Sequence, residues 1–332
     1  MLYITTRDNR DANTAYKTLH TNTATDGGAY IPFQMPVFTS EEIETLVSTS
    51  FSETVAAILN KFFSCKISGW DVDFCIGRNS VKIVQMPHRM AVAELWHNPK
   101  GTYESAIIEL FKKIAGENSE TITEWFAIAA RIAIIFGIYT QMRQNNVISH
   151  CDTFDISLPS DDFDIPVAGF YARMMGLPID TIVCTGDESS GVWDFINLGE
   201  LNIALVGNNK IGFERYIYSK FSADEVKKMI DVCSKKRTYR VSEEALPDFN
   251  QGMFCATAGK NRIAHMINSI FRSNKYIIDP GAALCVGGLQ DYRAKVGESK
   301  LTVVLSEISP LLKTREITEA TGISTDKLSD YM

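Results

Sequence analysis

The sequence lacks the cysteine spacing of a disulfide framework or of a zinc site. Its seven cysteines are odd in number and widely scattered, and no C-x-x-C pair occurs. Disulfide-rich secreted domains and zinc-binding modules both depend on regularly spaced cysteines. Cys184 and Cys285 lie in apolar runs, so we expect them to be small core residues.

The sequence also lacks an excess of positive charge and an apolar run of membrane-spanning length. The formal net charge is −7, which gives no electrostatic footprint for nucleic acid or for an anionic membrane. No basic segment followed by an apolar one opens the chain, and Glu124 and Arg131 interrupt the apolar stretch at residues 122–139. We predict a cytoplasmic protein in which this stretch is a buried helix, with neither nucleic acid nor a membrane as partner.

What is present is the composition and rhythm of an α/β protein. The chain has 332 residues, of which 45% are hydrophobic, enough for a large core and two domains. Strand patterns alternate with helical ones, which favours a parallel sheet. Ser40 and Ser50 are candidate helix caps. We predict helices at 11–20, 41–47, 52–62 and 102–114, and strands at 81–86, 91–95, 156–158, 182–184 and 302–305.

Short motifs spread along the chain resemble those of one enzyme family. Residues 3–7 (YITTR) and 26–32 (DGGAYIP) are similar to Y-x-S-T-R and D-G-G-L-Y-V-P of threonine synthases. Residues 158–165 (LPSDDFDI), 276–283 (YIIDPGAA) and 303–310 (VVLSEISP) resemble V-P-T-G-N-F-G-N, Y-x-x-D-P-H-T-A and V-V-L-S-T-A-H-P of the same family. The resemblance spans nearly the whole chain.

The resemblance implies a fold and a division of the chain. The fold is that of fold-type II pyridoxal-phosphate enzymes, the tryptophan synthase β-like group. We predict a helix-rich region at 1–80, a reduced small-domain remnant at 81–150 and a C-terminal α/β domain at 151–332. The small domain is reduced because the family's T-S-G-D-T-G segment, which contacts substrate and cofactor, occurs nowhere in the sequence. The arginine that follows the family's N-S-I-N motif also has no counterpart at 125–128.

One substitution within the resemblance bears directly on chemistry. Residues 95–105 (LWHNPKGTYES) look like L-F-H-G-P-T-L-A-F-K-D, which places Glu104 where the family has its essential lysine. That lysine forms a Schiff base with pyridoxal phosphate, and a carboxylate cannot form an imine with an aldehyde. We therefore expect no catalytic residue at this position and no bound pyridoxal phosphate.

The loop that resembles the family's phosphate-binding segment has become acidic. It carries Asp161, Asp162 and Asp164, where the family's G-N-F-G-N loop wraps the cofactor phosphate with backbone N–H groups. Like charges roughly 4 Å apart repel by about 1 kcal/mol in bulk water, and by several times more in a medium of lower dielectric. Glu307 replaces the small hydroxyl residue that the family places near the pyridine nitrogen.

By this resemblance the old cofactor cleft becomes the predicted ligand site. It is expected to be formed by His97, Asn98, Glu104, Ser105, Ser160, Asp161, Asp162, Phe163, Asp164 and Glu307. No metal is expected, although the carboxylates of Asp161, Asp162 and Asp164 leave a divalent-cation site open.

Other interpretations of single residues also stay open. Glu104 can be an ordinary acidic residue in a first helical turn capped by Thr102. Lys100 is a candidate substitute nucleophile, because it lies four residues earlier. His97 can be a hydrogen-bonded wall residue rather than a catalytic group.

Two functions follow from these observations. The first is a catalytically degenerate, threonine-synthase-like protein that binds a small amino-acid-like ligand or a protein partner in a regulatory role, as a homodimer or a heterodimer. The alternative is a pyridoxal-phosphate-dependent phospho-lyase, a threonine synthase acting on O-phosphohomoserine. The identity of the residue that faces the aldehyde decides between them.

Overall fold

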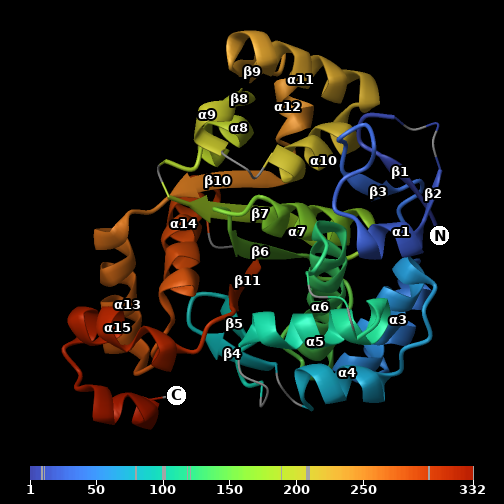
Figure 1. The fold of residues 1–332 in the computed structure, drawn as a ribbon. Coiled ribbons are helices and arrows are strands. Elements are labelled where there is room, and N and C mark those ends of the chain that lie inside the picture. The colour runs from blue at the N-terminus through green and yellow to red at the C-terminus, as the bar shows by residue number, and fades with distance from the viewer. Residues whose placement is uncertain are drawn as a thin grey trace.

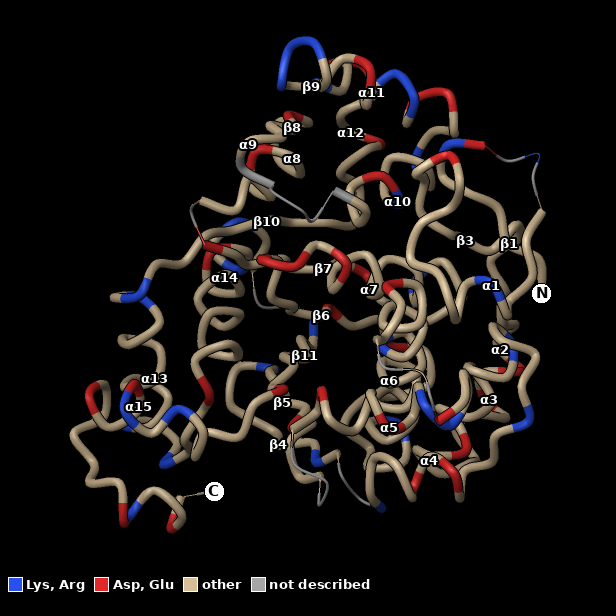
Figure 2. The backbone as a smooth tube through the Cα atoms, viewed as in Figure 1, with Lys and Arg blue, Asp and Glu red and all other residues tan. Residues whose placement is uncertain are grey.

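The structure is a computed structural model, and its elements are arranged around one large sheet (Figure 1). It describes residues 1–8, 10, 12–78, 81–98, 102–117, 119, 121–187, 189–206, 210–297 and 300–331. Positively charged lysine and arginine and negatively charged aspartate and glutamate are spread over the described part of the chain (Figure 2).

Within the described residues the central sheet has six strands in the order β10-β7-β6-β11-β5-β4. All neighbours are parallel except β4 and β5, which form an antiparallel hairpin. The parallel sheet predicted from the sequence is thus confirmed, with β10 as an additional strand. The bounds are β4 Lys82–Met86, β5 Met90–Glu94, β6 Phe154–Pro159, β7 Ile179–Gly186, β10 Met253–Thr257 and β11 Leu301–Ser306.

Successive strand residues face two separate hydrophobic cores, as the two-residue period of a strand requires. Val304 packs with residues of α14 (Pro280–Val296), whereas its neighbour Val303 packs with the core that contains α6 (Glu124–Gln144) and α7 (Asp164–Met174). Helices therefore cover both faces of the sheet, which is why its strands are near-continuous apolar runs rather than alternating ones. The α/β expectation is confirmed.

Helix α6 lies at the centre of the larger core. It is buried along most of its length, including Trp125, Phe126 and Phe136, so the buried helix expected at 122–139 is confirmed. By length and composition it is the one described helix that could cross a bilayer, but 83% of its most apolar window is buried inside the protein. Burial on all sides explains why it is hydrophobic all round.

The N-terminal region surrounds α6 with short helices and a small antiparallel sheet in the order β2-β1-β3. The predicted helix at 52–62 appears as α3, capped by Ser50 as expected. The cap of α2 is Thr39, one residue before the predicted Ser40, because the Thr39 side chain accepts from the N–H of Glu42. The bounds are β1 Leu2–Thr5, β2 Asn13–Thr14, α1 Ala15–His20, β3 Tyr30–Pro32, α2 Ser40–Val47, α3 Phe51–Phe63 and α4 Gly69–Ile76.

The helix predicted over 11–20 is shorter than expected. Residues 13–14 pair with β1, the helix begins at Ala15, and Asp11 lies outside the described residues. The strands β1 and β3 and the helix α4 are not among the sequence predictions.

The other elements connect and flank these layers. Helix α5 follows β5, and the elements from β8 to α12 lie together at one end of the molecule, where β8 and β9 form a two-stranded sheet (Figure 1). Their bounds are α5 Tyr103–Ala115, α8 Val192–Leu198, β8 Glu200–Asn202, α9 Ile203–Val206, α10 Lys210–Lys220, α11 Ala223–Lys236, β9 Thr238–Arg240, α12 Leu246–Phe249, α13 Lys260–Asn274, η1 Pro310–Lys313, α15 Thr314–Thr321 and η2 Thr325–Tyr331.

Arg215 joins the N-terminal sheet to the start of α7. Its side chain is fully buried, its Nε donates to the carbonyl of Tyr30 at 3.3 Å, and its Nη1 lies 3.2 Å from Asp164 Oδ1. The preceding residue, Glu214, accepts from Arg7 Nη2 at 2.7 Å. Two adjacent residues of α10 thus fix distant parts of the chain to each other.

Replacing Arg215 should destabilise the protein strongly. Arg215→Met leaves the half-buried carboxylate of Asp164 without its cation, and removing one partner of a buried ion pair lowers the free energy of unfolding by about 3–5 kcal/mol. Arg240→Met removes the exposed pair with Glu200 and should lower it by about 0–1 kcal/mol. Urea denaturation measures both, and Arg215→Met/Asp164→Asn should recover part of the loss. Equal losses for the two arginines would contradict the role of Arg215.

Candidate functional site

A cleft of about 430 Å³ opens where α5, α6 and the start of α7 meet. It lies near the carboxyl ends of the parallel strands β6 and β11, the edge of an open α/β sheet where ligands generally bind. Its walls include Glu104, Asp162, Asp164 and Glu307, four residues that the sequence resemblance assigns to one site. The other lining residues are Tyr103, Ile107, Ile122, Glu124, Ala127, Ile128, Arg131 and Ile165.

Glu104 lies in the first turn of α5. The side chain of Thr102 caps this helix by accepting from the N–H of Ser105 at 3.2 Å, which agrees with the capped first turn proposed from the sequence. Glu104 is exposed toward the cleft. Among the described residues no cation pairs with it. Glu104, which the sequence resemblance places at the family's lysine position, therefore presents a carboxylate to the cleft.

In the acidic loop, aspartate side chains accept hydrogen bonds from backbone N–H groups. Asp161 Oδ1 accepts from the N–H of Asp187 at 2.8 Å, and Asp162 Oδ1 accepts from the N–H of Asp164 at 3.1 Å. The N–H of Asp164 lies at the start of α7, a place where N–H groups commonly bind a phosphate, whereas Asp187 follows β7. These residues do not fit the pyridoxal phosphate that the fold implies, because carboxylates occupy donors that its phosphate would need.

Glu307 and Arg131 face each other across the cleft. They form an ion pair, and the Arg131 guanidinium lies 5.4 Å from the ring centroid of Tyr103. Because Glu307 follows β11 and Arg131 comes from α6, the pair bridges two walls of the cleft. Sequence analysis noted Arg131 only as a break in an apolar stretch, and its spacing on α6 gives no signal for a site.

The environment of the cleft disfavours the ionised form of two of its carboxyl groups. Burial raises the pKa of the Asp164 carboxyl, which the Arg215 charge opposes and the Asp162 charge reinforces. Burial also raises the pKa of Glu124, again against the effect of Arg215 and with that of Asp164. Glu124 was not among the predicted site residues.

Some predicted site residues lie outside the cleft lining. His97 Nε2 lies 2.5 Å from the Glu94 carboxylate, which also accepts from the hydroxyl of Tyr276 at 2.6 Å. This favours the wall role proposed for His97. Asn98 donates to the carbonyl of Thr102 at 3.1 Å. The Ser105 hydroxyl bonds to that of Thr102. Ser160 and Phe163 are buried, and Phe163 stacks on Phe213, whereas Asp161 is exposed and accepts from the N–H of Asp187.

Two further predictions concern residues near this site. Lys100, the candidate substitute nucleophile, lies outside the described residues. Over the described part of the chain no group of three or more histidine, cysteine, aspartate or glutamate side chains has the geometry to hold a metal ion. The acidic loop is therefore not supported as a cation site.

Comparison with known proteins agrees with this geometry. Residues 2–79 match the family model for the threonine synthase N terminus. Threonine synthase-like 1 from Homo sapiens is 21% identical over 234 residues, which cover 64% of this chain and 31% of that protein. The chain thus spans less than a third of the length of the curated relatives that it matches.

Solved structures give the same result for the fold. The PLP-bound threonine synthase from Brucella melitensis superposes with a TM-score of 0.82 at 16% identity, covering 97% of this chain and 92% of that one. Yeast threonine synthase superposes with a TM-score of 0.83 at 15% identity, covering 98% and 92%. The chain therefore has the fold of threonine synthases. The fold predicted from the resemblance is confirmed, while the domain division and the internal deletion stay predictions.

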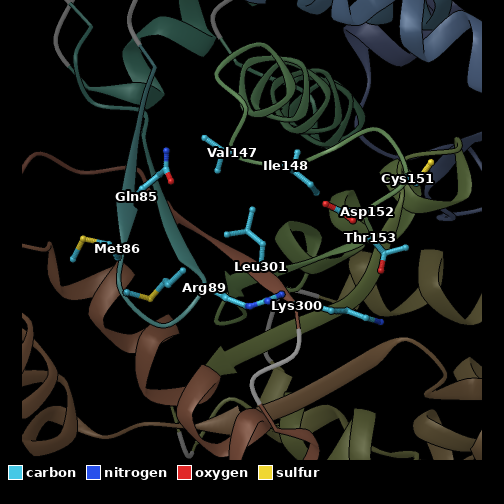
Figure 3. A pocket seen from close by; sticks show the side chains of 11 residues that line it. Gln85, Met86, Arg89, Val147, Ile148, Cys151, Asp152, Thr153, Lys300 and Leu301 are labelled. Carbon is cyan, nitrogen blue, oxygen red and sulfur yellow. The ribbon is translucent and has the colours of Figure 1, made fainter.

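A second hollow of about 500 Å³ lies at the opposite edge of the central sheet. Figure 3 shows it between the β4–β5 hairpin, which carries Gln85 and Met86, and the segment with Cys151 and Asp152. Lys300 reaches its rim, but its ammonium group already pairs with Asp180 at 2.5 Å. This edge holds the amino ends of β6 and β11, away from the acidic cleft.

Asp155, near this edge, makes the stability depend on pH. Burial, with the charge of Asp180, raises its pKa from 3.8 to about 6. The folded protein therefore holds this proton more tightly than the unfolded chain, so stability falls as pH rises from about 4 to 6 and then levels off.

Asp155→Asn should remove this dependence. The asparagine oxygen can still accept from the N–H of Thr181. The difference in unfolding free energy between variant and wild type should therefore shift in favour of the variant by roughly 2 kcal/mol between pH 4 and pH 7. Denaturant unfolding at each pH measures this difference. Asp224→Asn on the exposed face of α11 is the control and should show no such change with pH. A pH-independent difference for Asp155→Asn would contradict the assignment.

Proposed function

We propose that this chain is a threonine-synthase-like binding protein that does not form a Schiff base and uses the cleft to hold a ligand. The observation that carries the proposal is the carboxylate of Glu104, which faces the cleft at the position where the family has its lysine. An aldehyde cofactor needs an amine at this place, and a carboxylate supplies none.

Two features of the cleft support the same proposal independently of Glu104. The loop before α7 already satisfies backbone N–H groups with Asp161 and Asp162. Glu307 is held by Arg131, so the charge that replaces a neutral hydroxyl is fixed in place by an ion pair. Each feature would disfavour a dianionic cofactor, and a change at Glu104 alone would not restore its binding.

The alternative function, a pyridoxal-phosphate-dependent phospho-lyase acting on O-phosphohomoserine, draws its support from the fold. The PLP-bound enzyme from Brucella melitensis has the same arrangement of elements. Fold alone does not carry an activity, because activity depends on the side chains of the site. The alternative requires a lysine other than residue 104 to reach the cofactor, and Lys100 is the candidate.

Incubation with pyridoxal phosphate tests the proposal. The full chain is mixed with the cofactor, its visible absorbance is recorded, and the mixture is reduced with borohydride and mapped by peptide mass spectrometry. After unbound cofactor is removed by gel filtration, we expect no cofactor absorbance band with the protein and no reduced adduct in the peptide that contains residues 95–105. An adduct on Lys100 together with a visible band would overturn the proposal.

A lysine introduced at residue 104 separates the two reasons why we expect no bound cofactor, which are the missing amine and the acidic loop. Glu104→Lys should still give no stable band, because Asp161 and Asp162 keep the loop acidic. Glu104→Lys/Asp162→Asn removes one of these charges and should bind the cofactor more tightly than Glu104→Lys. A full band with Glu104→Lys alone would show that the missing amine is the sole obstacle and that the acidic loop is not one.

A further inference from the structure

The hollow at the amino ends of β6 and β11 is lined by charged groups of both signs. Arg89, from the turn between β4 and β5, and Lys300, just before β11, are basic, whereas Asp152 is acidic. Figure 3 shows the Arg89 side chain pointing across the hollow toward the start of β11, with Asp152 beside Ile148 on another wall. A volume of about 500 Å³ is in the range of small-molecule sites.

The backbone that carries Arg89 has an uncommon conformation that its neighbours hold in place. His88 and Arg89 have positive φ values of 61° and 46°, although neither is glycine. Arg293 of α14 donates from Nη1 to the carbonyl of His88 at 2.6 Å and from Nη2 to that of Arg89 at 3.0 Å. The N–H of Thr302 also donates to the Arg89 carbonyl, at 2.9 Å. The turn is thus fixed before any ligand arrives, and backbone strain maintained by surrounding contacts is typical of binding sites.

The carboxylate of Asp152 is oriented by its own segment. Its Oδ2 accepts from the N–H of Ser149 at 3.2 Å, and the N–H of Asp152 donates to the Ser149 carbonyl at 3.3 Å. Ile148, in the same segment, is buried and anchors it in the core. Arg89 and Asp152 therefore reach one hollow from two separately fixed segments.

Apolar side chains line the same hollow, namely Met86, Met90, Val147, Ile148 and Leu301. Lys300 already pairs with Asp180 at 2.5 Å, so it contributes a positive charge at the rim. The Arg89 guanidinium has five N–H donors, two of which can bind a carboxylate in parallel. A matching ligand has a carboxylate, an ammonium group and an aliphatic body.

A ligand with a single charge matches the hollow less well. An aliphatic amine would bring a positive charge toward Arg89, and an aliphatic acid would bring a negative charge toward Asp152. A zwitterion whose two charged groups are attached to the same carbon avoids both repulsions, because each group can face the wall of opposite charge.

We propose that this hollow binds a free amino acid with an aliphatic side chain. The α-carboxylate pairs with Arg89, the α-ammonium group pairs with Asp152, and the side chain lies against the apolar lining. This site and the acidic cleft lie at opposite edges of the central sheet. A cofactor bound in the cleft would leave the hollow unchanged, so the two functions are tested independently.

Isothermal titration calorimetry of the full chain with L-leucine tests the proposal. We expect saturable binding to a single site. 3-Methylbutan-1-amine lacks the carboxylate and 4-methylpentanoate lacks the ammonium group, so each should bind at least about tenfold more weakly through the loss of a charged hydrogen bond. L-Serine keeps both charges but loses apolar contact, and it too should bind about tenfold more weakly.

Variants relate the binding to the two charged groups. Arg89→Gln and Asp152→Asn should each weaken L-leucine binding by about five- to tenfold, whereas Arg89→Lys keeps the charge and should lose less than Arg89→Gln. Arg315→Gln on α15 and Asp224→Asn on α11 remove the same charges from exposed positions and should leave the affinity unchanged. Thermal unfolding shows whether each variant is folded.

Hydrogen–deuterium exchange of the unmodified chain locates the ligand without any substitution. L-Leucine should slow amide exchange in peptides that cover residues 86–90 and 147–153. Peptides that cover residues 103–107 and 124–131, in the acidic cleft, should exchange at the same rate with and without it.

Four outcomes would overturn the inference. The first three are the absence of saturable heat with L-leucine, binding of either singly charged analogue as tightly as L-leucine, and a loss in Arg315→Gln or Asp224→Asn equal to that in Arg89→Gln. The fourth is slowed exchange at residues 103–107 and 124–131 instead of in the hollow, which would assign the ligand to the acidic cleft.

Discussion

The contact between Arg215 and Asp164 is the constraint on which the arrangement of the cleft depends. The Arg215 side chain is fully buried and forms an ion pair with the carboxylate of Asp164, the first residue of α7. Because Arg215 also donates to Tyr30, the same side chain ties the N-terminal sheet to that helix. The loop before α7 is thereby held in a conformation in which its other aspartates face backbone N–H groups. Burying the Arg215 guanidinium without a partner would destabilise the fold, whereas its ion pair with Asp164 compensates for the lost hydration.

Sequence patterns predicted the parts of the fold that rest on local rules. Helix α3 follows its serine cap and its apolar periodicity, and α6 follows from a continuous apolar stretch. The strands of the parallel sheet are apolar runs, so they too were found, with the exception of β10. The small strands β1 and β3 were missed because they are three or four residues long and their pairing joins segments distant in sequence. Helix α4 begins with a glycine and includes two aspartates, which hides its periodicity.

The cleft was partly predictable for a different reason. Glu104, Asp162, Asp164 and Glu307 were placed together by resemblance to a family, and the structure brings all four to one cleft. Arg131 and Glu124 were missed as site residues, since they lie seven residues apart on a helix that appeared to be entirely core. Only the packing of α6 against the loop before α7 turns its first two turns toward the cleft. Tertiary contact of this kind has no signature in a single sequence.

The direct connection between the two helical walls has a consequence for how any occupant would exchange. Helices α5 and α6 are consecutive, and α5 is anchored through α4 and α3 to α6 itself. The walls consequently belong to one packed body. An occupant would therefore enter and leave a cleft whose shape this packing has already set.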